Sequence, residues 1–350
     1  MRSRPNDKWT PSSPLVCVLL YTSLCGGLWG CDDDSEPRDE TAGETAAGVT
    51  AAGERTAGMM SSGADEGGAE SGEESMLAET CGPDGPSRLY AVVELRFAAP
   101  ADGVSPGFDL DDSSGAPDEE RGCGKPDYQT EEGAPGIDNQ FSDLLPVIDP
   151  LVNRPVNDAL AETISEGRLI LLIEVEGIDD LERDDCVNVN IYRADEGALF
   201  GGDGLLLAGQ SYALDLTQPW SRAEGGQVRE GRVITPPFDF TLPLNFFGEE
   251  VDVSLARTRL SLSLDPSAPG GVLAGGLMID PFVEEVAMIA QDFILVARNL
   301  LTSKADLLPN ADGRCQAIST VWTLSARSGY LYRDTPRPEA GPTDFSGATP

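Results

Sequence analysis

Histidine is absent from the 350-residue sequence. At an ordinary usage of roughly 2%, a chain of this length would carry about seven histidines. The absence excludes Ser-His-Asp and Cys-His catalysis, histidine-ligated zinc and most haem ligation. The remaining chemistry depends on carboxylates, tyrosine, lysine, arginine or metals with oxygen ligands. Because no catalytic motif is present either, the sequence disfavours an enzyme without deciding the question.

Basic residues are scarce as well. The chain has 24 of them against 60 acidic residues, which gives a formal net charge of -36. The lysines are Lys8, Lys125 and Lys304, and the other basic residues are arginines. So acidic a chain repels phosphate backbones and anionic lipid headgroups. We therefore expect no nucleic-acid partner and no attachment to membranes through surface charge.

Long apolar runs are missing except near the N-terminus, where "PLVCVLLYTSLCGGLW" spans Pro14–Trp29. The run is short and interrupted by glycine, so it fits a bilayer span poorly. Arg2, Arg4 and Lys8 precede it, as basic residues precede the apolar region of a secretory signal peptide. We predict that residues 1–30 are a signal peptide.

The four residues Leu28-Trp29-Gly30-Cys31 resemble the lipobox of bacterial lipoproteins, which is aliphatic, variable, small and cysteine. Trp29 departs from the small residue that is usual at its place. The resemblance implies that Cys31 becomes the mature N-terminus and carries a diacylglycerol thioether and an amide-linked acyl chain such as palmitate. Each buried methylene contributes about 0.8 kcal/mol, so three chains hold a domain on a membrane. The alternative is an ordinary secretory signal with Cys31 as a bystander.

Anchoring at Cys31 would make a bacterial membrane the first partner of the protein. Asp32 directly follows the cysteine and resembles an inner-membrane retention signal of enteric bacteria. That rule does not transfer safely between lineages. We expect an exported, lipid-anchored protein, with the outer membrane or cell surface favoured over the inner membrane.

The chain is expected to divide into a tether, one folded domain and a tail. Residues 31–86 are mostly small or polar, and fifteen acidic residues and two arginines lie between Asp32 and Pro86. Such a segment buries too little apolar area to offset the entropy of ordering, so a disordered acidic linker is predicted. Residues 87–332 are expected to form a single β-rich globular domain, and residues 333–350 a disordered tail.

Runs rich in branched and aromatic residues predict strands. They are Arg88–Ala98, Arg168–Ile178, Cys186–Ala194, Phe238–Leu244, Val251–Asp265 and Ser319–Ala326. In the third run, Val187 and Val189 alternate with Asn188 and Asn190, which is typical of a half-buried strand. In the fifth run the apolar parity switches, which predicts a β-bulge near Arg257–Arg259.

Two regions favour helices. Asp280–Lys304 has apolar residues at helical spacing, with Asp280 as the expected N-cap and Pro281 as the first helical residue. Its broad apolar face predicts one long buried helix. The other region, Asn139–Gly167, is divided by three prolines and ends in a glycine that suits a C-terminal cap. The fold class expected is α+β: mainly antiparallel β sheet or sandwich, one long buried helix, short proline-broken helices and bracing disulfides.

Four cysteines follow the predicted signal peptide and lipidation site: Cys81, Cys123, Cys186 and Cys315. An even number in an oxidising compartment implies two disulfides, with three possible connectivities. Their spacings match no zinc-binding template.

A glycine- and proline-rich stretch contains the candidate metal ligands Asp109, Asp111, Asp127 and Asp138. Carboxylates in such a loop are ligands that calcium prefers. The stretch lacks the ordered D-x-D-x-D-G spacing, and in so acidic a chain a solvated loop is the more expected reading. Asp138 is equally well placed to cap a helix that begins at Asn139. No other cofactor is expected.

With Gly136–Asn139 midway and Asp312–Thr320 near its end, the globular body as a whole resembles uncharacterised exported proteins of myxobacteria and their relatives. The resemblance carries no known activity. The leading interpretation is a membrane-anchored lipoprotein displayed on the surface or in the periplasm. It would have a non-enzymatic binding or structural role at the cell envelope, with a protein or glycan partner. The alternatives are a carboxylate-dependent hydrolase of polysaccharide and a carrier of an apolar ligand.

Overall fold

The computed structural model describes residues 81, 85–115, 123–151, 154–195, 197–246, 249–267, 269–289, 291, 294–338 and 341–344. The predicted signal peptide, Cys31 and nearly all of the linker over 31–86 lie outside these residues. In the part of the chain that is described, no helix has the length and apolar character needed to cross a membrane.

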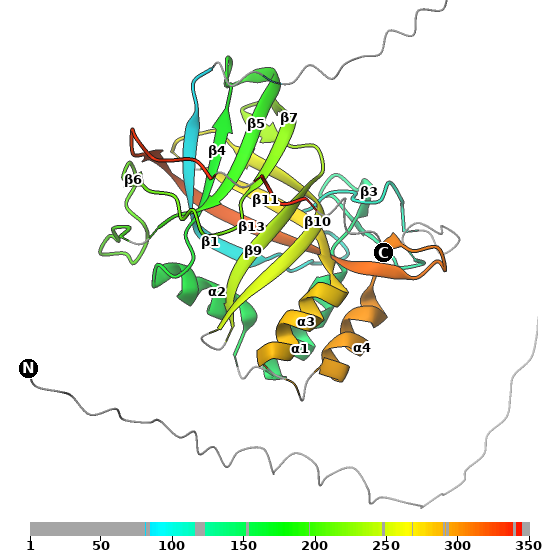
Figure 1. Ribbon diagram of the computed structural model, residues 1–350. Coiled ribbons are helices and arrows are strands. Elements are labelled where there is room, and N and C mark those ends of the chain that lie inside the picture. The colour runs from blue at the N-terminus through cyan, green and yellow to red at the C-terminus, as the bar shows by residue number, and fades with distance from the viewer. Residues whose placement is uncertain are drawn as a thin grey trace, which may run out of the picture. The chain divides into compact units, whose positions relative to one another are not determined.

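Most of the structure is antiparallel β sheet (Figure 1). The strands are β1 (Arg88–Phe97), β2 (Tyr128–Gln129), β3 (Pro135–Ile137), β4 (Leu171–Glu176), β5 (Arg183–Arg193), β6 (Ser211–Tyr212), β7 (Ser221–Arg229), β8 (Arg232–Ile234), β9 (Phe238–Phe246), β10 (Glu249–Ser263), β11 (Gly270–Met278), β12 (Leu307–Pro309) and β13 (Cys315–Leu331). The six runs that the sequence predicts as strands all lie in this set, so the β-rich expectation is confirmed.

The main sheet closes on itself. Its order is β1-β4-β5-β7-β8-β10-β11-β13, and β13 also pairs with β1. Strands β9 and β12 add to β10 and β13, and β6 pairs with β13 in parallel. The ring is completed between β7 and β10 by the short strand β8, which pairs with Gln227–Arg229 of β7 and with Ser261–Ser263 of β10. Pairing of most strand edges in this way removes a common route to aggregation.

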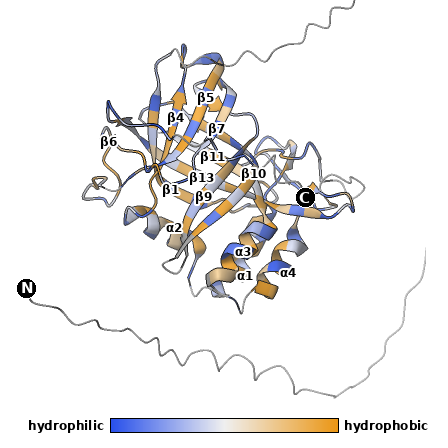
Figure 2. Ribbon diagram, viewed as in Figure 1, coloured by the Kyte–Doolittle hydropathy of each residue, from blue (hydrophilic) through white to orange (hydrophobic). Residues whose placement is uncertain are grey.

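The core lies on one face of these strands. Val187, Val189 and Ile191 of β5 are at most 3% exposed and belong to the largest buried apolar cluster, together with Phe240 and Trp322. Hydrophobic bands recur along the strands, interrupted by hydrophilic ones (Figure 2). Complete burial of one large apolar side chain contributes about 1.5–3 kcal/mol, so this cluster dominates the stability of the fold.

Two loops cover the opposite face of the sheet. Leu206 and Leu214, from the segment between β5 and β7, pack on Leu172 and Tyr192 in a second cluster. Leu110, from the loop after β1, packs against Val321 of β13 in a third cluster. The long loop after β1 is therefore anchored to the outer face of β13.

The bulge predicted in the fifth run is present. The register of β10 shifts between Ala256 and Arg259 against β11, and between Leu255 and Thr258 against β9. Arg257 has a φ of 53°, the left-handed conformation that accommodates an extra residue. The change of apolar parity in the sequence marked this position.

Strand β5 differs from the half-buried strand that its alternation predicts. Asn188 and Asn190, expected to face solvent, are 1% and 0% exposed. The Asn188 amide donates a hydrogen bond to the backbone carbonyl of Cys81 at 3.1 Å. Arg222 of β7 donates a hydrogen bond to Asn190 Oδ1 at 2.9 Å. Each amide thus has one polar partner, while Asn188 Oδ1 and Asn190 Nδ2 are buried without a hydrogen-bond partner among the described residues. Alternation alone does not reveal such partners.

The helices gather at one end of the sheet (Figure 1). They are the 3₁₀ helix η1 (Gln140–Leu144), α1 (Leu145–Leu151), α2 (Val156–Ser165), α3 (Ile279–Ile289) and α4 (Ile294–Lys304). Gly167 has a φ of 72° just after α2, as expected for a C-terminal cap. The short helices expected around the prolines are thus present.

In place of one long buried helix over Asp280–Lys304, the structure has the two helices α3 and α4. Val283 and Leu301 are buried, but Met288 and Leu295 are 75% and 73% exposed. Each of the two short helices buries one apolar face against the core. Apolar residues on the other faces, such as Met288 and Leu295, are therefore exposed. Neither proline nor glycine occurs within Ala290–Phe293 to indicate a break.

The start of α3 also differs slightly from the expectation. Asp280, expected as the N-cap, lies within the first turn of α3 and forms an ion pair with Arg298 of α4. The pair joins the first turn of α3 to the second helix, so the aspartate contributes to packing of the helices against each other.

Both expected disulfides form, and the structure selects one of the three connectivities. Cys81 pairs with Cys186 in β5, and Cys123 pairs with Cys315 at the start of β13. The bridges close loops of 105 and 192 residues. Closing loops of this length stabilises a fold by about 3–5 kcal/mol per bridge.

Part of the segment predicted as a disordered tail lies against the sheet. Arg337 forms an ion pair with Glu174 of β4, and the Thr343 amide donates a hydrogen bond to the Trp220 carbonyl at 2.8 Å. The composition of residues 333–350 predicts little burial because few of them are apolar. The contacts of this segment instead come from the Arg337 guanidinium and from hydrogen bonds of Thr343 to the Trp220 carbonyl. Amino-acid composition does not indicate such polar contacts.

Candidate metal centre

The four aspartates singled out in the sequence lie around one small region. Asp109 and Asp111 belong to the loop that follows β1, Asp127 precedes β2, and Asp138 follows β3. Strands β2 and β3 pair with Tyr128 opposite Ile137, so Asp127 and Asp138 are the next residues at the same end of this hairpin.

Three of these aspartates come together closely. One carboxylate oxygen each from Asp109, Asp111 and Asp138 lies within 4.8 Å of the other two. Asp138 is 1% exposed and Asp111 is 7% exposed. The spacing and the hard oxygen ligands suit calcium, for which these three carboxylates would supply part of a shell of about six to eight oxygens. The solvated loop is therefore not what the structure shows for Asp111 and Asp138.

Local hydrogen bonds orient these carboxylates. The backbone N–H of Asp112 donates to Asp109 Oδ1 at 2.6 Å, and that of Ser113 donates to Asp111 Oδ1 at 2.9 Å. Such contacts over two or three residues are typical of aspartate-stabilised turns. The N–H of Leu110 donates to Asp138 Oδ2 at 2.6 Å and joins the loop to the hairpin. Asp138 thus binds the loop and does not cap the helix that follows.

Two glycines permit the close approach of these segments. A Cβ atom on Gly115 would lie 2.4 Å from the backbone nitrogen of Asp127, and one on Gly136 would lie 2.7 Å from the Ser113 carbonyl oxygen. Their φ values are 70° and 96°, which favour glycine in any case. The loop after β1 is therefore pressed against both strands of the hairpin.

A fifth aspartate, Asp306, joins the group and was missed by sequence reasoning. It precedes β12, is 0% exposed, and accepts hydrogen bonds from the Ser319 N–H at 2.7 Å and the Ser319 hydroxyl at 2.5 Å. It is close enough to Asp138 to raise the pKa of that group. No signal near Asp306 in the sequence marks it, because its neighbours in the fold are distant along the chain.

The electrostatics of the group disfavour full ionisation. Burial, together with the nearby Asp306, Asp111 and Asp127, raises the pKa of Asp138 to about 9, against the hydrogen bond from Leu110. Burial also raises the pKa of Asp306 to about 7 despite its two bonds from Ser319. The pKa of Asp111 rises through burial too. Without a cation, these carboxyls retain protons that ordinary aspartates lose.

Within the close triad of Asp109, Asp111 and Asp138, two oxygens are buried without a hydrogen-bond partner among the described residues: Asp138 Oδ1 and Asp111 Oδ2. Buried polar atoms in native proteins nearly always have partners, so each needs an explanation. Two arginines lie near the group: Arg257 lowers the pKa of Asp111, and Arg259, whose guanidinium lies over the Phe108 ring, donates a hydrogen bond from Nη1 to the Asp109 backbone carbonyl at 3.4 Å. A bound cation would satisfy both oxygens.

The burial of Asp111 and Asp138 does not suit these two residues as the catalytic carboxylates of a polysaccharide hydrolase. A glycosidase needs two carboxylates on either side of a sugar ring, about 5–10 Å apart and open to substrate. The carboxylates of Asp111 and Asp138 are covered by the loop and the hairpin.

Comparison with known proteins finds no matching family model, no similar curated protein and no similar solved structure.

Proposed function

We propose that the protein is an exported lipoprotein, anchored through Cys31, whose folded part binds calcium and has a non-enzymatic binding or structural role at the cell envelope. The observation that carries the calcium proposal is the buried carboxylate group with two oxygens that lack partners. The ligands would be Asp109, Asp111 and Asp138, with Asp127 and Asp306 adding negative charge.

Calcium fits this group better than other common metals. The site offers only oxygen atoms, which calcium and magnesium prefer. Zinc and copper favour histidine or thiolate, and the chain has no histidine while its four described cysteines form disulfides. Calcium takes ligands from flexible loops and tolerates irregular geometry, whereas magnesium retains several waters in an octahedral shell. A site built from an irregular loop therefore favours calcium.

A structural role for the ion follows from its position. The three ligands come from the loop after β1 and from the end of the β2–β3 hairpin, so one ion would hold these two separate parts of the chain together. Exported proteins bind calcium with dissociation constants of about 10⁻⁴ to 10⁻³ M. The ion would be in place outside the cell and would fix the loop against β13.

The lipid anchor is supported by the sequence around Leu28–Cys31 and by the two disulfides, which form in oxidising compartments. Metabolic labelling with an alkyne fatty acid tests it. We expect label on the wild-type protein and none on Cys31→Ala. Equal labelling of both would contradict the anchor and leave the calcium proposal unaffected.

Calcium binding is tested by thermal unfolding of the full-length protein in detergent after removal of divalent ions with EDTA. At 10 mM calcium, about 10–100 times the expected dissociation constant, binding should stabilise the fold by about 1.4–2.7 kcal/mol. For a domain of this size the melting temperature should rise by about 3–10 °C.

Asp138→Asn is the matched variant for this experiment. The amide keeps an acceptor for the Leu110 N–H but removes the charge, so the calcium shift should disappear. Glu132→Gln, an exposed acid on the turn of the same hairpin, should behave as wild type. No shift in the wild type, or an equal shift in Asp138→Asn, would refute the calcium site.

A further inference from the structure

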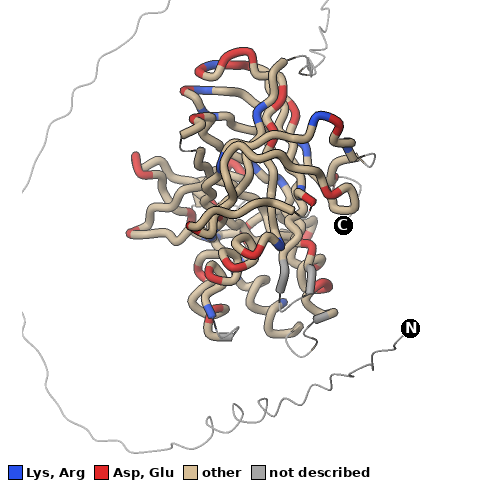
Figure 3. Tube along the Cα trace, turned by 90° about the vertical axis from the view of Figure 1, so that its left-hand side faces the viewer, with Lys and Arg blue, Asp and Glu red and all other residues tan. Residues whose placement is uncertain are grey.

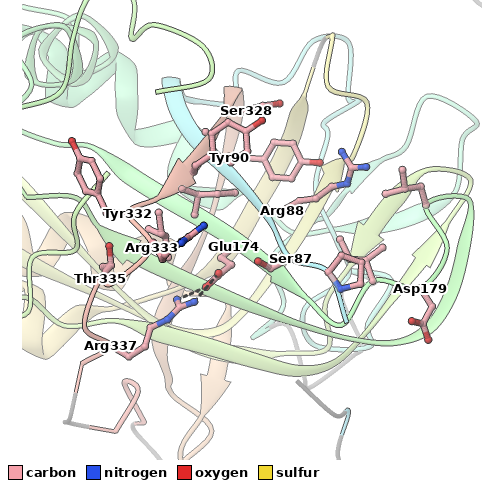
Figure 4. A pocket seen from close by; sticks show the side chains of 17 residues that line it. Ser87, Arg88, Tyr90, Glu174, Asp179, Ser328, Tyr332, Arg333, Thr335 and Arg337 are labelled. Carbon is pink, nitrogen blue, oxygen red and sulfur yellow. Dashed lines mark hydrogen bonds and ion pairs between the residues drawn. The ribbon is translucent and has the colours of Figure 1, made fainter. Parts of the chain in front are cut away.

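The C-terminal segment crosses the outer face of the sheet over β4, β5 and β7. Residues 333–338 and 341–344 of this segment are described. Arg337 reaches Glu174 of β4, as Figure 4 shows, and Thr343 binds the backbone carbonyl of Trp220, just before β7.

Glu174 points away from the core, yet it is only 2% exposed. The Arg337 guanidinium contacts both oxygens of this carboxylate, with Nη2 to Oε1 at 2.9 Å. Two parallel contacts of this kind match a planar guanidinium and not the single ammonium of lysine.

Other groups around the guanidinium complete its surroundings. Arg337 Nη1 donates a hydrogen bond to the Tyr192 hydroxyl at 3.1 Å, and its Cζ lies 5.6 Å from the centroid of that ring. Glu176 Oε1 lies 3.8 Å from Nη2. We call Glu174, Glu176 and Tyr192 the arginine site, because together they supply two carboxylates, a hydroxyl acceptor and an aromatic face.

The segment that occupies this site has few other attachments. Arg333, Pro336 and Arg337 are exposed, and the amide and hydroxyl of Thr343 donate hydrogen bonds to the Trp220 carbonyl. Segments with exposed residues and few contacts open at low cost relative to the core.

A cavity of about 690 Å³ adjoins the occupied site. Ser87 and Asp179 lie on one side of it, and Arg333, Thr335 and Arg337 on the other (Figure 4). The Thr335 hydroxyl is buried there without a hydrogen-bond partner among the described residues. The cavity therefore gives a second chain room to approach the arginine site alongside the segment.

We infer that the arginine site recognises an extended, arginine-containing segment of a partner protein, and that Arg337 fills the site in cis until the partner displaces it. The inference names a partner class for the proposed binding role and rests on that role, but not on calcium. The occupant already present shows the chemistry of the ligand: an arginine followed by proline in an extended chain.

Charge decides between a partner protein and a second copy of this chain. Acidic residues recur along the loops and helices of the folded part, and Lys and Arg are fewer (Figure 3). With a net charge of -36, two copies repel each other, whereas a basic partner is attracted and its association is accelerated.

The test uses full-length Arg337→Ala and a fluorescent peptide with the sequence of residues 333–342, RDTPRPEAGP. Fluorescence anisotropy should show binding to Arg337→Ala at least tenfold tighter than to wild type, whose site is filled. Peptides with Arg337→Ala or Arg337→Lys should bind at least tenfold more weakly than the parent. The affinity should fall as salt is raised.

Arg333→Ala is the matched control protein, because Arg333 lies on the same segment and has no carboxylate within ion-pair distance among the described residues. It should bind the peptide no better than wild type. Adding Glu174→Gln to Arg337→Ala should abolish binding, and circular dichroism reports whether that variant folds. If the double variant does not fold, the weaker binding expected of the Arg337→Ala and Arg337→Lys peptides still tests the inference.

Equal binding of the peptide to Arg337→Ala and wild type would overturn the inference, as would equal binding of the parent and Arg337→Ala peptides. Dimerisation of the wild type that the peptide reverses would assign the site to a second copy and overturn the assignment to a partner protein. The calcium shift should be the same in Arg337→Ala and wild type, so failure here is distinguishable from failure of the calcium site.

Discussion

Glu174 and Asp138 are two acids buried to a similar degree, 2% and 1% exposed, with opposite surroundings. The chain supplies Glu174 with a guanidinium that contacts both oxygens. It supplies Asp138 with one backbone N–H, and the charged groups that shift its pKa are further aspartates. The contrast indicates that the first acid is neutralised within the chain, whereas the second needs protons or a cation from solution.

Each region also has a disulfide of its own. Cys81–Cys186 lies on the side of β5 that carries Asn188, near the arginine site, and Cys123–Cys315 joins the chain before Asp127 to the start of β13. If the carboxylate group depends on its bridge, Cys123→Ala with Cys315→Ala should cost about 3–5 kcal/mol and also reduce the calcium shift. Removing the Cys81–Cys186 bridge should cost a similar amount and leave the calcium shift intact. Urea unfolding with and without calcium measures both, and loss of the shift in both variants would contradict the local role.

The pH dependence of stability separates the two acids more sharply. Because the folded pKa of Asp138 is raised to about 9, the folded state keeps a proton that the unfolded state loses above its ordinary value of 3.8. Stability without calcium is therefore highest at low pH and falls as pH rises toward 9, by at most about 1.4 kcal/mol per pH unit for one proton. Relaxation of the site reduces this, so we expect a loss of about 2–3 kcal/mol from pH 5 to pH 8. Calcium or Asp138→Asn should flatten the profile in urea unfolding, and a flat profile for the calcium-free wild type would refute the raised pKa.

Arg337→Ala tests the other side of the comparison. Leaving a buried acid without its partner costs about 3–5 kcal/mol in a closed interior. The Arg337 side chain is 46% exposed and the cavity beside it admits water, so we expect about 1–2 kcal/mol. Adding Glu174→Gln should recover part of the loss, because it removes the unpaired charge. Urea unfolding at pH 7 measures this, and a single variant as stable as wild type would show that Glu174 is solvated.

The smallest effect concerns the close packing around the carboxylates. Gly136→Ala introduces a Cβ atom 2.7 Å from the Ser113 carbonyl oxygen, whereas Gly133→Ala on the same hairpin meets nothing within 4 Å. Both have positive φ, so backbone strain should cost about 1 kcal/mol in each, and Gly136→Ala should cost more because its Cβ also displaces a backbone carbonyl. The calcium shift should shrink only in Gly136→Ala. Equal shifts would mean that loop packing does not set the ligand geometry.

Local signals in the sequence predicted much of the fold. The parity change around Arg257 predicted the bulge, and the prolines within Asn139–Gly167 predicted short helices. The reversal between α3 and α4 left no such signal, because residues 290–293 include neither proline nor glycine. Local pattern thus predicted elements and turns better than it predicted how α3 and α4 pack.

The candidate metal centre also contains residues that the sequence predicted and one that it did not. Asp109 and Asp111 lie two residues apart, and Asp127 and Asp138 flank one hairpin, so a single stretch of sequence contained them. Asp306 arrives from a distant segment through its bonds to Ser319 and could not be predicted. The sequence assigned Arg337 to a disordered tail because residues 333–350 contain few apolar side chains. The position of Arg337 in the fold depends instead on its ion pair with the buried carboxylate of Glu174.

The Cys81–Cys186 bridge has a mechanical consequence. Cys81 precedes β1, and its sulfur is bonded into β5, two strands away in the ring. A pulling force applied through the chain before Cys81 therefore enters the sheet at β5 and bypasses the first hydrogen bonds of β1. Strand β1 cannot be peeled from its end as in an unbridged sheet, and rupture would require shearing β5 from two neighbours at once. The oxidation state of this one bridge therefore decides whether a load from the N-terminal side enters the sheet at β5 or at the end of β1.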